Sequence, residues 1–294
     1  MSTPALVASR APALDYAELT KPRITLMVML TAMVGFVMAS PVGGVSASGL
    51  LTMLAGTGLV AAGASALNMV LERRTDALML RTRQRPLPAG RLRPGEASGF
   101  GIALTAAGLA VLAVASGTPA AAVALLTWVS YLFFYTPLKT RTSLSTIVGA
   151  FPGALPPVIG WAAARGGIDP GAYVLFAILF LWQIPHFLAI AWIYREDYAR
   201  GGLPMLPVID VAGRMTGRQA VAHSLALLLV SIGPAAAGLA GRAYLVGALL
   251  LGLVLTAAAV RLAVQRTQPA ARGLFLASLA YLTAINALLL IDRL

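Results

Sequence analysis

Cysteine is absent from the 294 residues, and charged residues are scarce. Without cysteine the chain forms neither a disulfide framework nor a thiolate metal site, and it has no cysteine nucleophile. Only 11% of the residues are charged, against about 25% in a typical soluble domain, and intrinsic disorder is excluded because it requires high charge and low hydrophobicity. Apolar residues make up 59% of the chain, and the mean hydropathy is +0.84. A water-soluble core cannot bury so much apolar surface, so we expect lipid to surround most of the chain.

Nine apolar blocks are long enough to cross a membrane, for which a helix needs about 20 residues. The blocks cover 24–41, 47–71, 97–116, 118–135, 144–164, 171–193, 221–240, 243–262 and 272–291. Barrel strands are excluded because they are about 10 residues long and alternate in polarity. Glycines and prolines inside the fifth block predict a kinked or broken helix: Gly149, Pro152, Gly153, Pro156 and Pro157. The predicted fold class is therefore all-α, a polytopic bundle of about nine transmembrane helices.

Basic residues lie almost entirely on one side of the predicted spans. If successive spans alternate in direction, 19 of the 22 lysines and arginines fall on the side of the amino terminus, which leaves Arg165, Arg242 and Arg293 on the other. Because cytoplasmic loops carry the excess of basic residues, we expect the amino terminus to be cytoplasmic. Charges confined to short loops also argue against nucleic acid as the partner of a chain with a net charge of +12.

Residues 1–23, which include Arg10, lack the charged start, apolar centre and small-residue cleavage site of a signal peptide. They are expected to form a short cytoplasmic tail, followed by a single transmembrane domain over 24–294. The chain has 20 arginines and two lysines and no leader of the kind that directs import into an organelle. We therefore expect a multi-pass protein of a bacterial inner membrane.

Three oxygen-bearing side chains recur every four residues at the end of the second span: Asn68, Glu72 and Asp76. If this helix continues past the membrane surface, they lie on one face, about 6 Å apart along the axis. Mg²⁺ binds through one or two carboxylates together with substrate phosphates, and arginine binds phosphate bidentately. Because Arg81 and Arg85 follow directly, the segment predicts a site for magnesium and a diphosphate. The alternative is a solvated helix end whose arginines only set the topology.

A second polar connection, 194–207, begins with Tyr194, Arg195, Glu196, Asp197 and Tyr198. Asp197, with Glu196 beside it, offers a further metal carboxylate, and Tyr194 offers a hydroxyl or an aromatic face. A structural role is the alternative, because tyrosines at the membrane surface are usually anchors and Arg195 can pair with Asp197. If this segment lies opposite the first motif, the two form a carboxylate clamp for a diphosphate.

Polar residues also occur inside the sixth span, in the segment 182–187 (WQIPHF). A polar group within a membrane span is costly and is usually functional, although a backbone carbonyl can satisfy a single buried histidine. Gln183 and His186 are three residues apart, so we expect both side chains to point together into the bundle. The other histidine, His223, is expected at the membrane surface.

The connection after the fourth span reads YTPLKTR from Tyr135 and adds Lys139 and Arg141. These two cations either bind phosphate or belong to the general excess of basic residues on the cytoplasmic side. The residues themselves leave both interpretations open.

These segments resemble the motifs of UbiA-type intramembrane prenyltransferases. The resemblance runs from about residue 15 to the end and rests on LTKPR, NMVLERRTDALMLRTRQRP, YTPLKTR, WQIPHF and PMLPV. The last two segments favour the haem-modifying branch of the family. The sequence departs from the family pattern at Glu72, where aspartate is more frequent, and in the second motif, where Asp197 stands without a second aspartate.

The resemblance implies a prenyltransferase that joins the farnesyl group of farnesyl diphosphate to a vinyl group of haem B. It assigns four residues to Mg²⁺: Asn68, Glu72, Asp76 and Asp197. It assigns five to the diphosphate: Lys21, Arg81, Arg85, Lys139 and Tyr194. It assigns three to the acceptor: Trp182, Gln183 and His186. Membrane lipid surrounds such an enzyme, and a downstream haem-modifying enzyme or terminal oxidase is an implied partner.

Two other functions fit part of the pattern. A sister prenyltransferase that acts on an aromatic acceptor such as 4-hydroxybenzoate would share the diphosphate site and differ only at the acceptor. A secondary transporter would fit the nine spans and the intramembrane Gln183 and His186. Transporters, however, bind near the membrane midplane and usually contain an internal repeat, whereas the charge here lies in loops. The haem-modifying prenyltransferase is therefore the main prediction.

Overall fold

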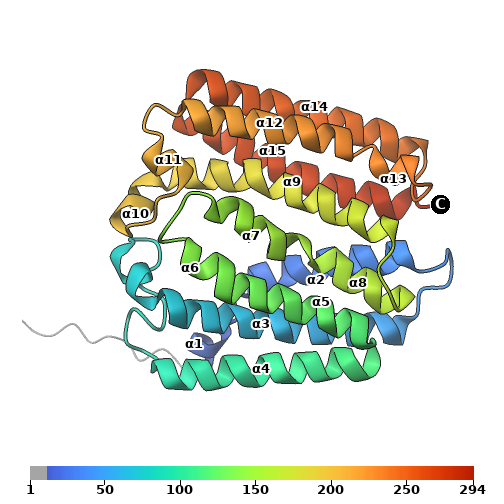
Figure 1. Ribbon diagram of the computed structural model, residues 1–294, viewed down its shortest axis with the longest axis horizontal. Helices are drawn as coiled ribbons and strands as arrows, with labels where there is room; N and C mark the ends of the chain where they lie inside the picture. The colour runs from blue at the N-terminus through green and yellow to red at the C-terminus, as the bar shows by residue number, and fades with distance from the viewer. Residues whose placement is uncertain (1–11) are drawn as a thin grey trace, which may run out of the picture.

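The computed structural model describes residues 12–294, and this part of the chain is built from helices (Figure 1). Nine helices or helix runs in it are long and apolar enough to cross a membrane, which confirms the predicted all-α bundle. They are α2 (Pro22–Ala39), α3 (Ala47–Leu78), α4 (Pro94–Ala115), α5 (Thr118–Val129) with the π-helix η1 (Ser130–Tyr135) and α6 (Thr136–Leu138), α7 (Ser145–Ala154) with α8 (Pro156–Arg165), α9 (Pro170–Ile193), α12 (Arg214–Val230) with α13 (Gly233–Ala236), α14 (Arg242–Gln265) and α15 (Gln268–Ile291). Three short helices lie outside these spans: α1 (Pro12–Leu19), α10 (Arg195–Arg200) and α11 (Leu206–Ile209).

The predicted spans differ from the helices mainly where a helix continues into polar sequence. α3 continues to Leu78, past the predicted end at 71, and α12 begins at Arg214, ahead of the predicted start at 221. Hydropathy does not detect such extensions, because they lie outside the apolar part of each span. Arg10 and the rest of 1–11 in the predicted tail lie outside the described residues.

The fifth span is broken, as its prolines predict. Leu155 separates α7 from α8, and the consecutive Pro156 and Pro157 begin the second half. Proline lacks a backbone N–H and its ring collides with the preceding turn, so a straight helix cannot pass through this pair.

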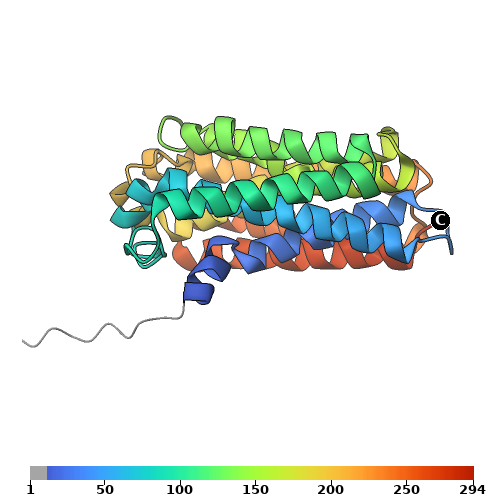
Figure 2. The same cartoon turned by 90° about the horizontal axis from the view of Figure 1, so that it is seen from below.

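Charged loops gather at one end of the bundle, which we call the loop end. It contains the α3–α4 loop (79–93), the α6–α7 loop (139–144) and the segment 194–213 with α10 and α11 (Figure 1). The carboxyl terminus lies at the opposite end (Figure 1). In Figure 2 the short α1 projects from the lower edge of the bundle near the loop end, and the long helices run side by side above it.

Backbone contact holds α2 against α8. A Cβ on Gly35 would collide with the carbonyl group of Pro157, and a Cβ on Gly160 would collide with the carbonyl of Ala32. Small residues allow such close approach between membrane helices. α2 is therefore fixed in the bundle, and it begins at the loop end directly after Lys21.

Candidate active site

α3 carries the three predicted oxygen ligands to the loop end. Its 32 residues span about 48 Å, more than the ~30 Å hydrocarbon layer of a bilayer, so its last turns extend beyond the membrane core. The helix therefore continues through the motif, as the four-residue spacing requires. Asn68 and Asp76 are buried and Glu72 is half-buried.

Asn68 connects Lys21 to the start of α6. Lys21 Nζ donates a hydrogen bond to Oδ1 of Asn68 at 2.7 Å, and Nδ2 of Asn68 donates to Oγ1 of Thr136 at 3.0 Å. Thr136 Oγ1 in turn donates to the carbonyl of Tyr131 at 2.8 Å. Both ends of the Asn68 amide are thus occupied, which fixes its orientation.

Lys21 is a cation surrounded by charges of both signs. Burial lowers the pKa of Lys21 to about 8, the carboxylate of Glu72 raises it, and the nearby Arg85 and Lys139 lower it further. The ammonium group is therefore charged at neutral pH but close to the pH at which it loses its proton. An anion bound beside it would stabilise the charged form.

Glu72 forms an ion pair with Lys139, with Oε1 and Nζ 2.7 Å apart. Lys139 Nζ also lies 5.3 Å from the centre of the Tyr135 ring, within the range of a cation–π contact. Burial by itself lowers the pKa of Lys139, but Tyr135 and Glu72 outweigh burial and raise this pKa above its usual value. Lys139 is therefore firmly charged.

Asp76 forms a second ion pair, with Arg85 of the α3–α4 loop. Arg85 Nη1 lies 2.7 Å from Oδ2 of Asp76, whose side chain is 1% exposed. Thr82 Oγ1 donates to the Asp76 carbonyl at 2.8 Å, so the loop folds back over the end of α3. Asn68, Glu72 and Asp76 thus each face a different cation.

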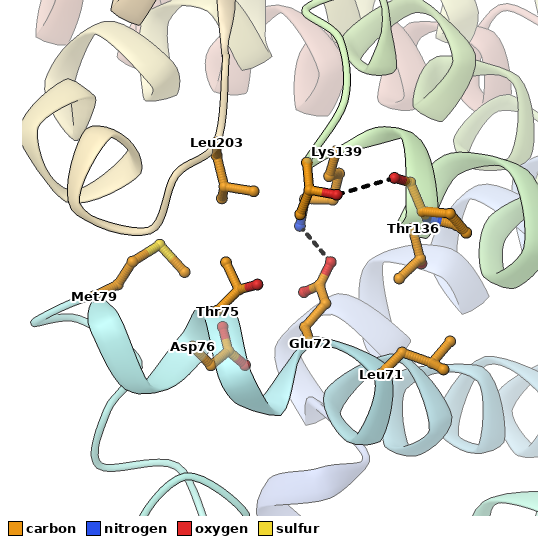
Figure 3. Close-up of a pocket in the computed structure, with 10 residues that line it drawn as sticks. Leu71, Glu72, Thr75, Asp76, Met79, Thr136, Lys139 and Leu203 are labelled. Carbon is orange, nitrogen blue, oxygen red and sulfur yellow. Dashed lines mark hydrogen bonds and ion pairs between the residues drawn. The ribbon is translucent and has the colours of Figure 1, made fainter.

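A cavity of about 220 Å³ opens between α3, α6 and the segment that follows α10 (Figure 3). In Figure 3 the carboxylates of Glu72 and Asp76 rise from α3, and Lys139 faces Glu72 from across the cavity. Apolar side chains close its edges. The lining consists of Leu71, Glu72, Thr75, Asp76, Met79, Thr136, Pro137, Lys139, Thr140 and Leu203.

The donor set of this cavity fits Mg²⁺ bound together with a phosphate. Among residues 12–294, no three or more His, Cys, Asp and Glu side chains gather closely enough to form a metal cage. Mg²⁺ needs no such cage, because it takes one or two carboxylates and completes its shell with water and substrate phosphates. Glu72 and Asp76, one helical turn apart, supply these two carboxylates. Asn68, one turn before Glu72, offers a further oxygen.

Asp197 fastens the α3–α4 loop to α10. Its Oδ1 accepts the N–H of Leu80 at 2.9 Å and a bond from Arg200 Nη2 at 2.6 Å, and its Oδ2 accepts the N–H of Arg81 at 3.1 Å. Burial raises the pKa of Asp197, but these hydrogen bonds outweigh burial and lower it. Leu203 of the same 194–213 segment lines the cavity opposite Glu72 and Asp76, whereas the Asp197 carboxylate binds the loop backbone beside it.

Arg81 and Tyr194 lie together outside that cavity. The guanidinium of Arg81 is 5.2 Å from the centre of the Tyr194 ring, and both residues are exposed. Glu196 is also exposed. Of the five predicted diphosphate ligands, Lys139 lines the cavity, while Lys21 and Arg85 contact the oxygen ligands on α3.

His186 and Trp182 lie against α15. His186 Nδ1 is 2.8 Å from Oγ of Ser278, and this Oγ donates to the Phe275 carbonyl at 2.6 Å. Because a hydroxyl has one proton, Nδ1 is the donor to Ser278, and Nε2 is left as the acceptor nitrogen. The rings of Trp182 and Phe275 stack with the imidazole, with centres 4.7 Å and 5.2 Å away.

Gln183 faces a different neighbour. Its Nε2 donates to the carbonyls of Ala150 on α7 and Leu179 at 3.1 Å and 3.0 Å. Residues three apart are offset by about 60° around an α-helix, and in a tight bundle this is enough to direct them to different helices. The expected common direction of Gln183 and His186 is therefore not found.

Sequence reasoning missed Thr136 and the contacts of Arg91. Thr136 lies inside the YTPLKTR segment, in which the prediction concerned only the cations Lys139 and Arg141. Arg91 pairs with Asp15 of α1 at 2.9 Å, although by sequence it counts simply as one of many basic loop residues. No sequence signal marks it, because the pair joins residues 76 positions apart.

The chain belongs to the UbiA prenyltransferase family, whose model matches residues 28–282. It is 50% identical over 291 residues to the protoheme IX farnesyltransferase of Solibacter usitatus, with 95% of this chain and 98% of that protein covered. Membership in this family removes the transporter alternative.

The fold also occurs in solved structures, among them the following two. One, described as digeranylgeranylglyceryl phosphate synthase in membranes, has a TM-score of 0.80 at 16% identity and covers 96% of this chain and 98% of its own. The other is a UbiA homolog from Archaeoglobus fulgidus bound to GPP and Mg²⁺, with a TM-score of 0.68 at 18% identity; the match covers 94% of this chain and 99% of that one. At these identities the likeness concerns the fold.

Proposed function

We propose that this chain transfers the farnesyl group of farnesyl diphosphate to a vinyl group of haem B, which gives haem O and diphosphate. The observation that carries the choice of substrates is the 50% identity, over 95% of the chain, to a curated protoheme IX farnesyltransferase. The geometry supports the reaction type, because carboxylates and cations face one another around a single cavity.

Mg²⁺ would be held by Glu72 and Asp76, with Asn68 as a further oxygen ligand, and would supply positive charge against the leaving diphosphate. The homolog from Archaeoglobus fulgidus, bound to GPP and Mg²⁺, supports a divalent metal bound together with a prenyl diphosphate. Asp197 is proposed as a fourth ligand, which requires it to exchange a loop hydrogen bond for the metal.

Lys21, Arg85 and Lys139 bind the diphosphate. Each now contacts an oxygen of the α3 motif. When a metal and a diphosphate are bound, the oxygens would hold the metal and the cations would hold the phosphates, so no charge would be left without a partner. When the bond between farnesyl C1 and the diphosphate oxygen breaks, negative charge grows where these cations lie, which lowers the barrier. Arg81 and Tyr194 are proposed to contact the diphosphate from outside the cavity.

The farnesyl cation must be kept from water until the acceptor attacks. Leu71, Met79 and Leu203 line the cavity and exclude water from this end of it. The vinyl group then forms a carbon–carbon bond to farnesyl C1. Water adds to the resulting cation and releases a proton, which leaves a hydroxyethylfarnesyl side chain.

Trp182, Gln183 and His186 are proposed to form the acceptor half of the site. His186 suits this role because its ring is held by two stacked aromatic rings and its Nε2 is an acceptor. The segment lies on α9 ahead of α10, which places it deeper in the bundle than the loop end.

We further propose that the loop end faces the cytoplasm of a bacterial cell and that the chain resides in the inner membrane. The positive charge of the loops supports this orientation, and the bacterial relative supports the location. The amino-terminal segment 1–23, which includes the packed helix α1, would then lie on the cytoplasmic side of one domain over 24–294. The product would pass to a downstream haem-modifying enzyme or a terminal oxidase.

The test is an assay of the purified protein in detergent with haem B, farnesyl diphosphate and Mg²⁺, followed by chromatography and mass spectrometry of the haem. We expect haem O to form, and to stop forming when a chelator removes Mg²⁺. A parallel reaction contains 4-hydroxybenzoate in place of haem B. Prenylation of that acceptor without any haem O would contradict the proposal and favour the sister prenyltransferase.

A further inference from the structure

Lys21 reaches the active site from the joint between α1 and α2. Its backbone has φ 46° and ψ 64°, a left-handed conformation that is uncommon for a residue with a side chain. Its N–H donates to the carbonyl of Glu18, in the last turn of α1, at 3.2 Å, and Pro22 follows with a restricted φ. The place of the Lys21 side chain therefore depends on where α1 sits.

α1 is seated against α3, α4 and the α3–α4 loop. Leu19 is fully buried, in one apolar cluster with Met69 of α3 and Leu92 of the loop. Tyr16 meets Phe100 of α4 edge to face, with ring centres 5.0 Å apart. These contacts set the depth of α1, but apolar contacts alone allow it to slide or rotate.

Arg91 joins α1 to the loop by directional contacts. Its Nε lies 2.9 Å from Oδ1 of Asp15, its Nη2 lies 3.4 Å from Oε2 of Glu18, and its Nη1 donates to the carbonyl of Gln84 at 2.9 Å. Asp15 is only 3% exposed, so its charge is compensated by Arg91 rather than by water. The same loop carries Arg85, which contacts Asp76 in the active site.

We propose that Arg91 and Asp15 are positioning residues, whose ion pair locks α1 to the α3–α4 loop so that Lys21 and Arg85 form one binding unit for the diphosphate of the prenyl substrate. Neither Arg91 nor Asp15 lines the cavity, so both act through Lys21. The inference rests on the proposed function, because it gives Lys21 a phosphate contact. Without Arg91 the buried carboxylate of Asp15 favours movement of α1 toward water, which withdraws Lys21.

A double-mutant cycle tests this coupling. The full-length protein, Arg91→Ala, Lys21→Ala and the combined variant are compared for binding of farnesyl diphosphate with Mg²⁺. We expect Arg91→Ala to weaken binding roughly tenfold, the scale of one lost charged hydrogen bond, and to add little once Lys21 is alanine, because both changes remove the same contact. Arg91→Lys retains a charge beside Asp15 and should recover part of the loss. Full additivity of the two single changes would overturn the proposal.

Arg165 offers a matched control because it fastens the other end of α2, where its Nε donates to the Ala39 carbonyl at 2.7 Å. Arg165→Ala should lower thermal stability and leave farnesyl diphosphate binding unchanged. If Arg91→Ala does not fold, Asp15→Asn provides the same test, because it breaks the pair without leaving a buried charge.

Failure of the proposed function and failure of the positioning role give different binding results. Wild-type protein that binds no farnesyl diphosphate with Mg²⁺ would refute the proposed function. Wild-type protein that binds it, together with Arg91→Ala or Asp15→Asn variants that bind it equally well, would refute only the positioning role.

Discussion

Lys139 Nζ lies 2.7 Å from Oε1 of Glu72, although the two residues are 67 positions apart. The same relationship joins Arg85 to Asp76. In each pair, a carboxylate suited to a metal is held by a cation suited to a phosphate. Removing one partner from a buried pair leaves an uncompensated charge, which is strongly destabilising. A metal–diphosphate complex carries both signs, so it can replace each contact without leaving a charge alone.

Asp76→Asn is expected to abolish turnover, with a loss of at least about a hundredfold, because a metal ligand loses its charge while its shape is kept. Haem O formation by the purified variant, measured over a series of Mg²⁺ concentrations, checks this. Its elution from a size-exclusion column should match that of the wild type. A near-normal rate at limiting Mg²⁺ would show that Asp76 is not a ligand.

Glu72→Asp is expected to retain more activity than Glu72→Gln. Aspartate keeps the charge that attracts both Mg²⁺ and Lys139, whereas glutamine keeps the length but leaves Lys139 without its anion. Initial rates of the two variants at saturating farnesyl diphosphate decide the order. The reverse order would point to packing, and not charge, as the contribution of Glu72.

Arg85→Ala is expected to weaken farnesyl diphosphate binding by roughly ten- to a hundredfold, the worth of a charged hydrogen bond of about 1.5–3 kcal/mol, while haem binding stays nearly constant. Arg83→Ala is the matched control, since Arg83 is exposed in the same loop. Separate titrations with the two substrates distinguish the effects. If the two variants bind farnesyl diphosphate equally well, Arg85 contributes only to the excess of basic residues that sets the membrane orientation.

The affinity for farnesyl diphosphate is expected to fall as the pH rises above 8. Burial lowers the pKa of Lys21 to about 8, so the empty protein holds the ammonium form below this pH and the neutral amine above it. Lys21→Arg should remove this part of the pH dependence, because arginine stays charged to above about pH 12. Binding titrations of both proteins across this range provide the check. If the affinity of Lys21→Arg falls with pH as steeply as that of the wild type, other groups cause the pH dependence.

His186→Ala is expected to change the absorption spectrum and the affinity of bound haem, with the farnesyl diphosphate affinity near wild type. The reason is that the variant loses the Nε2 acceptor held between Trp182 and Phe275. His223→Ala serves as the control, because His223 contacts the Gln219 carbonyl of its own helix. A haem spectrum that is the same in wild type and His186→Ala would mean that His186 only packs the bundle.

Much of the fold follows from composition along the chain. Blocks of about 20 apolar residues predict the spans, and the proline pair 156–157 predicts the break between α7 and α8. The prediction that Asn68, Glu72 and Asp76 share one face requires α3 to continue past its apolar block, which it does. These features are local, so the sequence contains the information directly.

The pairing of charges could not be predicted in the same way. Ion pairs join residues from distant segments, and 22 basic residues offer many combinations for each acid. Asp197 illustrates the difficulty, because a carboxylate that binds backbone N–H groups looks the same in sequence as one that binds a metal. The different directions of Gln183 and His186 likewise depend on which helices surround α9.

The π-helix η1 (Ser130–Tyr135) comes directly before Thr136 and Lys139. A π turn contains about one residue more than an α turn, so the residues after it are rotated by about 100° relative to a regular helix. Thr136 and Lys139 face Asn68 and Glu72 in this rotated register. The number of residues in this segment therefore matters as much as their types. Replacing the π turn by a regular α turn with the same number of residues would turn Thr136 and Lys139 away from Asn68 and Glu72, even though it would remove no side chain that contacts a substrate.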